Sequence, residues 1–123
     1  MAKDYRKILG TQGEQLVLQK YEKGNFKLLE KNWRVRIGEI DLIFQKKDIV
    51  VFVEVKTASS DEFGRPIEKI TPYKQKKLVQ LIEFYLATHK ISKKKRKIRV
   101  DAAEVFENSG IYDINIVENI IEL

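Results

Sequence analysis

The feature that most constrains the fold is the run Ile49-Val50-Val51-Phe52-Val53, which continues directly into Glu54-Val55-Lys56. A strand that is apolar on both faces has to be covered on both faces, which is typical of the central strand of a sheet packed between helices. A chain of 123 residues is the size of one domain. We therefore expect residues 1–123 to form a single α/β domain, in which a central mixed sheet is flanked by helices.

Apolar spacing on either side of this strand predicts the other elements. Residues 4–23 should form a helix that ends at Gly24, and a second helix should run from its N-cap Thr71 to about His89. The remaining pattern predicts strands at 26–29, 33–44, 49–56, 98–106 and 111–117, with turns at Asn25, Asn32 and 46–48. The expected order is α-β-β-β-α-β-β, and the second helix makes the crossover to a following strand.

The centre of the first expected helix contains Gly10 and Gly13. Each glycine lowers helix propensity by about 1 kcal/mol relative to alanine. Two explanations stay open: another backbone or a ligand approaches the helix closely here, or the helix has a boundary at this point.

Composition excludes several kinds of site. The chain has no cysteine, so disulfides, thiolate metal sites and cysteine nucleophiles are absent, and it has one histidine. The first residues are too charged for a secretory signal, and no apolar run approaches the roughly 20 residues that span a bilayer. We expect a cytoplasmic protein without a membrane partner.

The charge is distributed unevenly along the chain. Residues 1–100 carry 24 basic and 12 acidic side chains, a net charge of +12, whereas residues 101–123 carry six acidic side chains and no lysine or arginine. A basic body favours a polyanionic partner, with DNA as the first candidate. The candidate phosphate contacts are Lys74, Lys77, Lys93, Lys94, Lys95, Arg96 and Lys97. Alternatively, the run 93–97 is a solvated loop end.

Two carboxylates and a lysine form the candidate catalytic group. Glu54 and Lys56 are two residues apart and should share one face of the central strand. The hairpin turn at 46–48 should bring Asp41 of the preceding strand opposite residues 53–55. Carboxylates suit Mg²⁺ or Mn²⁺ in metal-assisted phosphodiester cleavage, and Glu14 could reach the same ion. The alternative is an ordinary ion pair between Glu54 and Lys56, worth at most about 1 kcal/mol.

Other candidate residues favour structural roles. Tyr73 and Trp33 could stack on bases, but aromatic residues beside apolar strands and helices usually pack in the core. His89 should interact with the last carbonyls of its helix. Arg99 and Asp101 share a strand face and should pair with each other or with the site.

The sequence also resembles a known family. The Asp41…Glu54-x-Lys56 arrangement is similar to the signature of restriction-endonuclease-like nucleases. Several short sequence motifs also resemble those of the YraN family of small bacterial endonuclease-like proteins. These motifs are Gly10-x-x-Gly13-Glu14, Asn32-Trp33-Arg34, Gly38-Glu39-Ile40-Asp41-Leu42-Ile43, Val51-Phe52-Val53-Glu54-Val55-Lys56-Thr57, Phe63-Gly64-x-Pro66, Lys74-Gln75-x-Lys77-Leu78 and Arg99-Val100-Asp101. The last motif, Arg99-Val100-Asp101, differs from the family's usual Arg-Phe-Asp.

The resemblance implies a restriction-endonuclease-like fold, which archaeal Holliday-junction resolvases also use. It implies that Asp41 and Glu54 are metal ligands, that Lys56 positions the attacking water, and that Glu14 is a helix-borne acid of the same site. Membership alone does not fix an activity.

Three functions are therefore open. The first is a Mg²⁺-dependent or Mn²⁺-dependent endonuclease acting on DNA, with branched or repair intermediates among its substrates; cutting both strands would favour a homodimer. The second is a nucleic-acid-binding module whose site is vestigial or needs a partner. The third is a protein-interaction domain in which the acidic segment from Glu104 to Glu122 docks on a basic partner.

Overall fold

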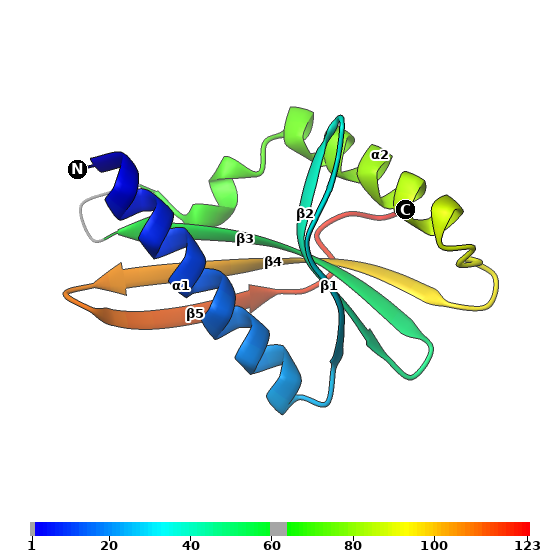
Figure 1. Cartoon of the computed structure of the whole chain (residues 1–123), viewed down its shortest axis with the longest axis horizontal. Coiled ribbons are helices and arrows are strands. Elements are labelled where there is room, and N and C mark those ends of the chain that lie inside the picture. Colours follow the sequence, from blue (N-terminus) through cyan, green and yellow to red (C-terminus); the bar gives the residue numbers. More distant parts are fainter. Residues whose placement is uncertain (1, 60–63) are drawn as a thin grey trace.

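The strand β3 (Ile49–Ser59) lies at the centre of the molecule, as its apolar sequence predicts. The computed structural model describes residues 2–59 and 64–123. Its sheet has the strand order β1 (Lys27–Val35), β2 (Gly38–Lys46), β3, β4 (Lys97–Asn108) and β5 (Ile111–Val117), as shown in Figure 1. Only the β3–β4 pair is parallel, so the sheet is mixed.

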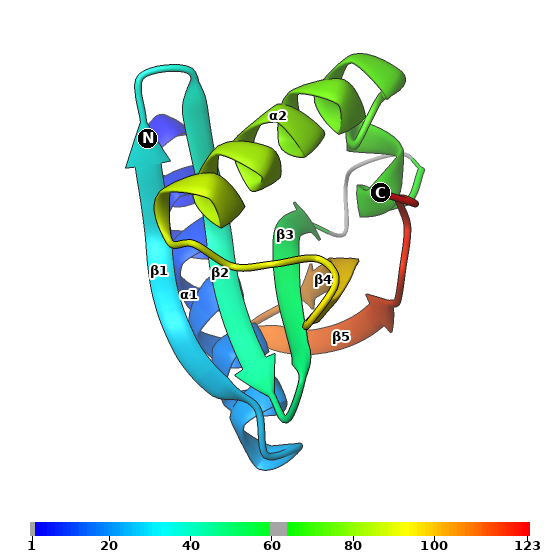
Figure 2. The same cartoon turned by 90° about the vertical axis from the view of Figure 1, so that its right-hand side faces the viewer.

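One helix covers each face of the sheet. The helix α1 (Ala2–Lys23) lies on one face, and α2 (Pro72–Thr88), which the short helix η1 (Pro66–Lys69) precedes, lies on the other (Figures 1 and 2). The order α-β-β-β-α-β-β and the α/β class are confirmed, and the arrangement is consistent with a restriction-endonuclease-like fold. No helix of the described residues is long and apolar enough to span a membrane.

The two faces of β3 belong to two separate hydrophobic clusters. Val51, Val53 and Val55 pack beneath α1, whereas Val50 and Phe52 pack beneath α2. Because side chains alternate along a strand, Glu54 and Lys56 follow Phe52 toward the α2 face, as the sequence predicts.

The predicted division of β1 and β2 is wrong. We expected strands at 26–29 and 33–44 with a turn at Asn32, but β1 runs unbroken from Lys27 to Val35 and the turn lies at Arg36-Ile37. Asn32 has a φ of 51°, which asparagine tolerates, so it bends the strand without ending it. The other elements lie where they were predicted, with β3 extending to Ser59.

Gly13 lies where α1 packs tightly against side chains of the sheet. A Cβ atom at this position would lie 2.6 Å from Thr57 Oγ1 and 3.5 Å from methyl groups of Val105. At Gly10 nothing lies within 4 Å of the same atom. A close approach therefore explains Gly13 and not Gly10, and the neighbouring atoms belong to side chains and not to another backbone.

The two glycines should respond oppositely to substitution by alanine. Gly10→Ala should raise the free energy of unfolding by up to about 1 kcal/mol, because alanine favours the helix and meets no neighbour. Gly13→Ala should lower it by about 1–3 kcal/mol, because the new methyl group forces α1 away from Thr57. Urea denaturation of both variants measures the difference, and equal effects would contradict the close approach.

Candidate active site

The candidate site begins where β2 separates from β3. Their backbone pairing runs from Lys46 opposite Ile49 to Leu42 opposite Val53. Beyond this pair, the carboxylate of Asp41 provides the acceptor: its Oδ2 accepts a hydrogen bond of 2.7 Å from the backbone N–H of Val55. A side chain thus replaces a backbone acceptor, and the two strands diverge at this point.

The alternation of β2 also breaks at Asp41. Ile40 and Ile43 both pack in the cluster beneath α2, while Leu42 and Phe44 pack beneath α1. Strict alternation would put Ile40 and Leu42 on the same face. The break turns the carboxyl group of Asp41 into the fork between the strands and not toward either core.

Glu54 meets Asp41 in this fork. Glu54 is buried, and the two side chains are hydrogen-bonded to each other. Burial, and after it the charge of Glu54, raises the pKa of Asp41 well above its ordinary value, although the Val55 N–H opposes the shift. With its pKa raised to about 8, Asp41 keeps a proton near neutral pH.

Two lysines reach the same oxygen of Glu54. Lys56 Nζ and Lys74 Nζ each lie 3.5 Å from Glu54 Oε2. Lys56 comes from the same strand, as predicted, whereas Lys74 comes from the first turn of α2. Thr71 fixes that turn, because its side chain accepts a hydrogen bond from the Lys74 N–H.

These residues line a cleft of about 400 Å³ between the β1–β2 hairpin and α2. Its charged lining residues are Glu39, Asp41, Glu54, Lys56, Lys74 and Lys77. A cleft of this size admits a ligand, and its polar groups converge on the middle of β3. The geometry can therefore bring an anionic ligand next to a pair of carboxyl groups.

Glu14 approaches the pair from the α1 face and does not line the cleft. Burial and the charge of Glu39 raise its pKa, with a smaller effect from Glu54, and a hydrogen bond from Asn32 opposes the shift. Within residues 2–59 and 64–123, no three histidine, aspartate or glutamate side chains converge to hold a metal ion. Asp41 and Glu54 are therefore the pair to which a metal could bind.

The basic run 93–97 lies away from the cleft. Lys97 begins β4 opposite Ile49, seven positions before Lys56 along β3, which corresponds to roughly 20 Å at the usual rise of a strand. Lys93 Nζ contacts Glu83 at 2.6 Å. Contacts of Lys93, Lys94, Lys95, Arg96 and Lys97 with nucleic acid stay a prediction, but these residues and the cleft lie at different positions along the sheet.

The structure places the other candidate residues in structural roles, with one exception. Trp33 packs against Tyr85 at 5.1 Å between ring centroids, and His89 Nδ1 lies 3.0 Å from the Tyr85 carbonyl. Arg99 and Asp101 pair with each other at 3.0 Å. The core position predicted for Tyr73 is wrong, because this side chain is 70% exposed at the edge of the cleft.

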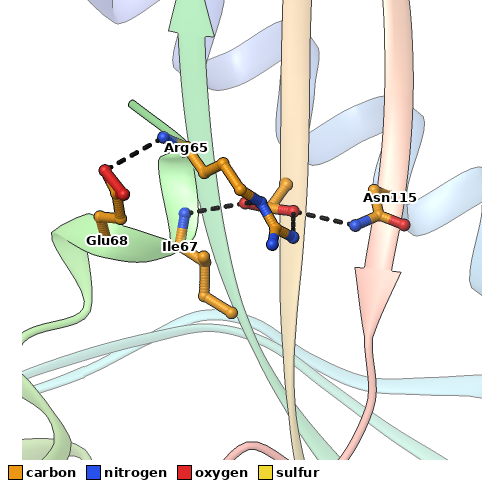
Figure 3. Close-up of polar contacts among 5 residues, drawn as sticks. Arg65, Ile67, Glu68 and Asn115 are labelled. Carbon is orange, nitrogen blue, oxygen red and sulfur yellow. Dashed lines mark hydrogen bonds and ion pairs between the residues drawn. The ribbon is translucent and has the colours of Figure 1, made fainter. Parts of the chain in front are cut away.

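A buried cluster around Glu104 was not predicted from the sequence. This side chain is 0% exposed and accepts hydrogen bonds from Arg65 Nη2 at 2.6 Å, Asn115 Nδ2 at 2.9 Å and the Ile67 N–H at 3.1 Å (Figure 3). Burial raises the pKa of Glu104, but these hydrogen bonds outweigh burial and hold the pKa below its usual value. The cluster ties η1, and with it the start of α2, to β4 and β5.

The same cluster argues against a free acidic tail. Of the acidic residues from 101 onward, Asp101, Glu104 and Glu107 are buried. Glu107 accepts a hydrogen bond from the Gly110 N–H at 2.9 Å within its own hairpin. These side chains serve the fold and are not available to dock on a basic partner.

Comparison with known proteins identifies relatives of similar length. The profile of the uncharacterised protein family UPF0102 matches residues 13–105, a range that includes Glu14, Asp41, Glu54, Lys56 and Lys74. A UPF0102 protein of Caldanaerobacter subterraneus is 39% identical over 121 residues, 98% of each chain. Proteins of this family from Clostridium perfringens and Vibrio campbellii are 35% and 34% identical, and the alignments cover 95% and 94% of this chain and 96% and 93% of theirs.

Replacing Asp41 by asparagine should change how stability depends on pH. Because the pKa of Asp41 is raised in the folded state, the folded protein keeps a proton that the unfolded chain loses, so stability falls as pH rises above the ordinary value of 3.8. Asp41→Asn removes this loss. The free energy of unfolding of the variant, relative to that of the wild type, should therefore increase with pH, by more than about 1 kcal/mol at pH 9.

Urea denaturation at pH 5, 7 and 9 measures this trend. Asp113→Asn is the matched control, because it makes the same chemical change at an exposed position of β5. A difference between Asp41→Asn and the wild type that stays constant with pH would contradict the raised pKa of Asp41.

Removing the Glu104 side chain should loosen η1. Glu104→Ala leaves the Ile67 N–H, Asn115 and Arg65 without their acceptor, and we expect a loss of about 3 kcal/mol in unfolding free energy. Hydrogen exchange at the Ile67 N–H should accelerate. Glu68→Ala is the control, because exposed Glu68 accepts from the Arg65 N–H at 3.2 Å, and its loss should cost less than about 1 kcal/mol. Equal losses in the two variants would be inconsistent with this anchoring.

Proposed function

The chain belongs to the UPF0102 family, and from the carboxyl pair in its cleft we propose that it is a metal-dependent nuclease that hydrolyses DNA phosphodiester bonds. The carrying observation is that Asp41 and Glu54 meet at the fork of two strands, with Lys56 and Lys74 at 3.5 Å from Glu54. This grouping supports membership of the restriction-endonuclease-like superfamily. The proposal goes beyond the family's own description, which is that of an uncharacterised family.

The residues present fit Mg²⁺ or Mn²⁺. Mg²⁺ prefers oxygen ligands and is usually bound by one or two carboxylates together with waters and substrate phosphates, so Asp41 and Glu54 suffice on the protein side. When bound, such an ion supplies charge neutralisation at the phosphate and a lower pKa for a coordinated water. The raised pKa of Asp41 supports the assignment, because a cation would relieve the repulsion that a proton now relieves.

The protein side chains have separate roles in this proposal. The Val55 N–H holds the Asp41 carboxylate in one orientation, and Glu54 is fixed by burial. Lys56, whose side chain is only 23% exposed, orients the attacking water beside Glu54. Lys74 stands on the open side of the cleft and contacts the phosphate. Glu14, as a helix-borne acid on the other face, adjusts the charge of the pair and does not contact the substrate.

A second candidate function is a nucleic-acid-binding module that does not cut. The observation in its favour is that the charges of the pair are already compensated within the protein, by Lys56, Lys74 and the proton that Asp41 retains. A vestigial site, or one that opens only with a partner, would look the same. The open cleft beside the pair favours the nuclease.

Cleavage of linear, nicked and branched DNA with Mg²⁺ or Mn²⁺ tests the proposal. Glu54→Gln and Asp41→Asn should each reduce the rate by at least about 100-fold, because each loses a charged ligand without a change in shape. Lys56→Met should reduce kcat more than KM, by roughly 10²-fold or more, because it removes a group that acts on the attacking water. Asp113→Asn should cut like the wild type.

The controls separate the two functions. Equal cleavage by the wild type, Glu54→Gln and Asp41→Asn would exclude this site as the source of activity. Absence of cleavage by the wild type, together with DNA binding that weakens steeply with salt, would favour the binding module.

A further inference from the structure

Tyr73 is the most exposed large hydrophobic side chain of the described residues, at 70%. It lies in the first turn of α2, on the lining of the cleft. In the same helix Tyr85 is 2% exposed and packs against Trp33 and Phe52, so α2 offers buried positions for aromatic residues. A single exposed hydrophobic side chain is common on a protein surface, so what distinguishes Tyr73 is its place on the lining of the cleft beside Lys74 and Lys77.

Two lysines of α2 line the same part of the cleft as this ring. Lys77 Nζ lies 5.6 Å from the centre of the Tyr73 ring, and Lys74 stands one turn of helix from Lys77. The Lys74 side chain is 48% exposed, so it can contact a ligand while it faces Glu54. The first two turns of α2 therefore present one aromatic ring and two ammonium groups to the cleft.

The opposite wall of the cleft is the turn of the β1–β2 hairpin, which stands apart from the start of α2 in Figure 2. It contributes Ile37, which is 45% exposed, together with Gly38 and the acidic Glu39. Apolar groups thus face the cleft from both sides and the ammonium groups of Lys74 and Lys77 from the α2 side, while the carboxyl groups of Asp41 and Glu54 lie between the walls.

Aromatic rings within a basic groove are the usual means of binding single-stranded nucleic acid, because bases stack on the rings while cations contact the phosphates. In a continuous duplex the bases stack on one another and cannot reach such a ring without being extruded. We propose that Tyr73 stacks on an unpaired base next to the phosphate held by Lys74 and Lys77, so that the cleft selects DNA with a single-stranded stretch over continuous duplex. This inference rests on the proposed function only in placing DNA in the cleft.

Binding without metal tests the inference separately from cleavage. In EDTA, fluorescence anisotropy would compare a labelled 12-nucleotide strand, the blunt duplex of the same strand, and a 12-unit abasic strand that has phosphates but no bases. The wild type should bind the single strand at least tenfold more tightly than the duplex or the abasic strand. Tyr73→Ala should weaken single-strand binding roughly tenfold and leave duplex and abasic binding unchanged.

Two further variants identify the interaction. Tyr73→Phe should bind the single strand like the wild type, because it keeps the ring, whereas Tyr73→Leu should behave like Tyr73→Ala. Lys77→Ala should weaken binding to all three probes and reduce the slope of log K against log salt by about 1. Because Tyr73 is exposed, none of its variants should alter the unfolding midpoint in urea.

The outcomes distinguish this inference from the proposed function. Equal affinity for single strand and duplex, or unchanged single-strand binding by Tyr73→Ala, would overturn the stacking role even if the protein cleaves DNA. A single-strand preference that depends on Tyr73 would support the inference even if no cleavage is found, and the proposed nuclease function would then fail alone.

Discussion

The hydrogen bond from the Val55 N–H to the carboxylate of Asp41 is the contact on which the site depends. Backbone pairing between β2 and β3 stops at Leu42 and Val53, and this bond satisfies the next donor of β3 while β2 turns away. A buried N–H without an acceptor would be costly. The fork is therefore compatible with a stable sheet only because an acidic side chain stands there. Glu54 follows one residue after Val53 and has to meet that acid.

The hydrophobic clusters on the two faces explain how the chain tolerates this arrangement. The buried carboxyl group of Glu54 and the half-buried one of Asp41 oppose folding when both are charged, and the proton that Asp41 retains is one response to that cost. The cores beneath α1 and α2 hold β3 from both sides, so the strand cannot shift to move Glu54 into water. The close approach of α1 at Gly13 and the Glu104 cluster under η1 position the two helices over the fork.

Those parts of the fold that follow from local pattern were predictable. The double-sided apolar run identified β3, two-residue alternation placed Glu54 and Lys56 on one face, and the hairpin turn expected at 46–48 brought Asp41 to residues 53–55. The turn expected at Asn32 failed because a positive φ can be absorbed inside a strand, and no local signal distinguishes the two cases. Lys74 was expected to bind phosphate from a helix, but its distance to Glu54 depends on how α2 crosses the sheet.

Burial of charge was the least predictable property. Glu104 has the sequence context of an ordinary strand residue near an acidic terminus, and its partners Arg65 and Asn115 lie 39 and 11 residues away. The prediction that Tyr73 packs in the core was wrong in the opposite direction, because the exposure of this side chain depends on where the cleft opens and not on helical spacing. Both depend on long-range packing, which periodicity does not report.

The local charge of the cleft refines what the basic body of the chain implies. Residues 1–100 carry a net charge of +12, yet the cleft lining pairs the carboxyl groups of Glu39, Asp41 and Glu54 with the ammonium groups of Lys56, Lys74 and Lys77. A phosphate that approaches the fully ionised cleft meets no net attraction there. It is attracted only when Asp41 is protonated or when a cation occupies the pair. The lysines of the body can raise the concentration of DNA near the protein, but the electrostatic state of Asp41 and Glu54 decides whether a phosphodiester enters the cleft.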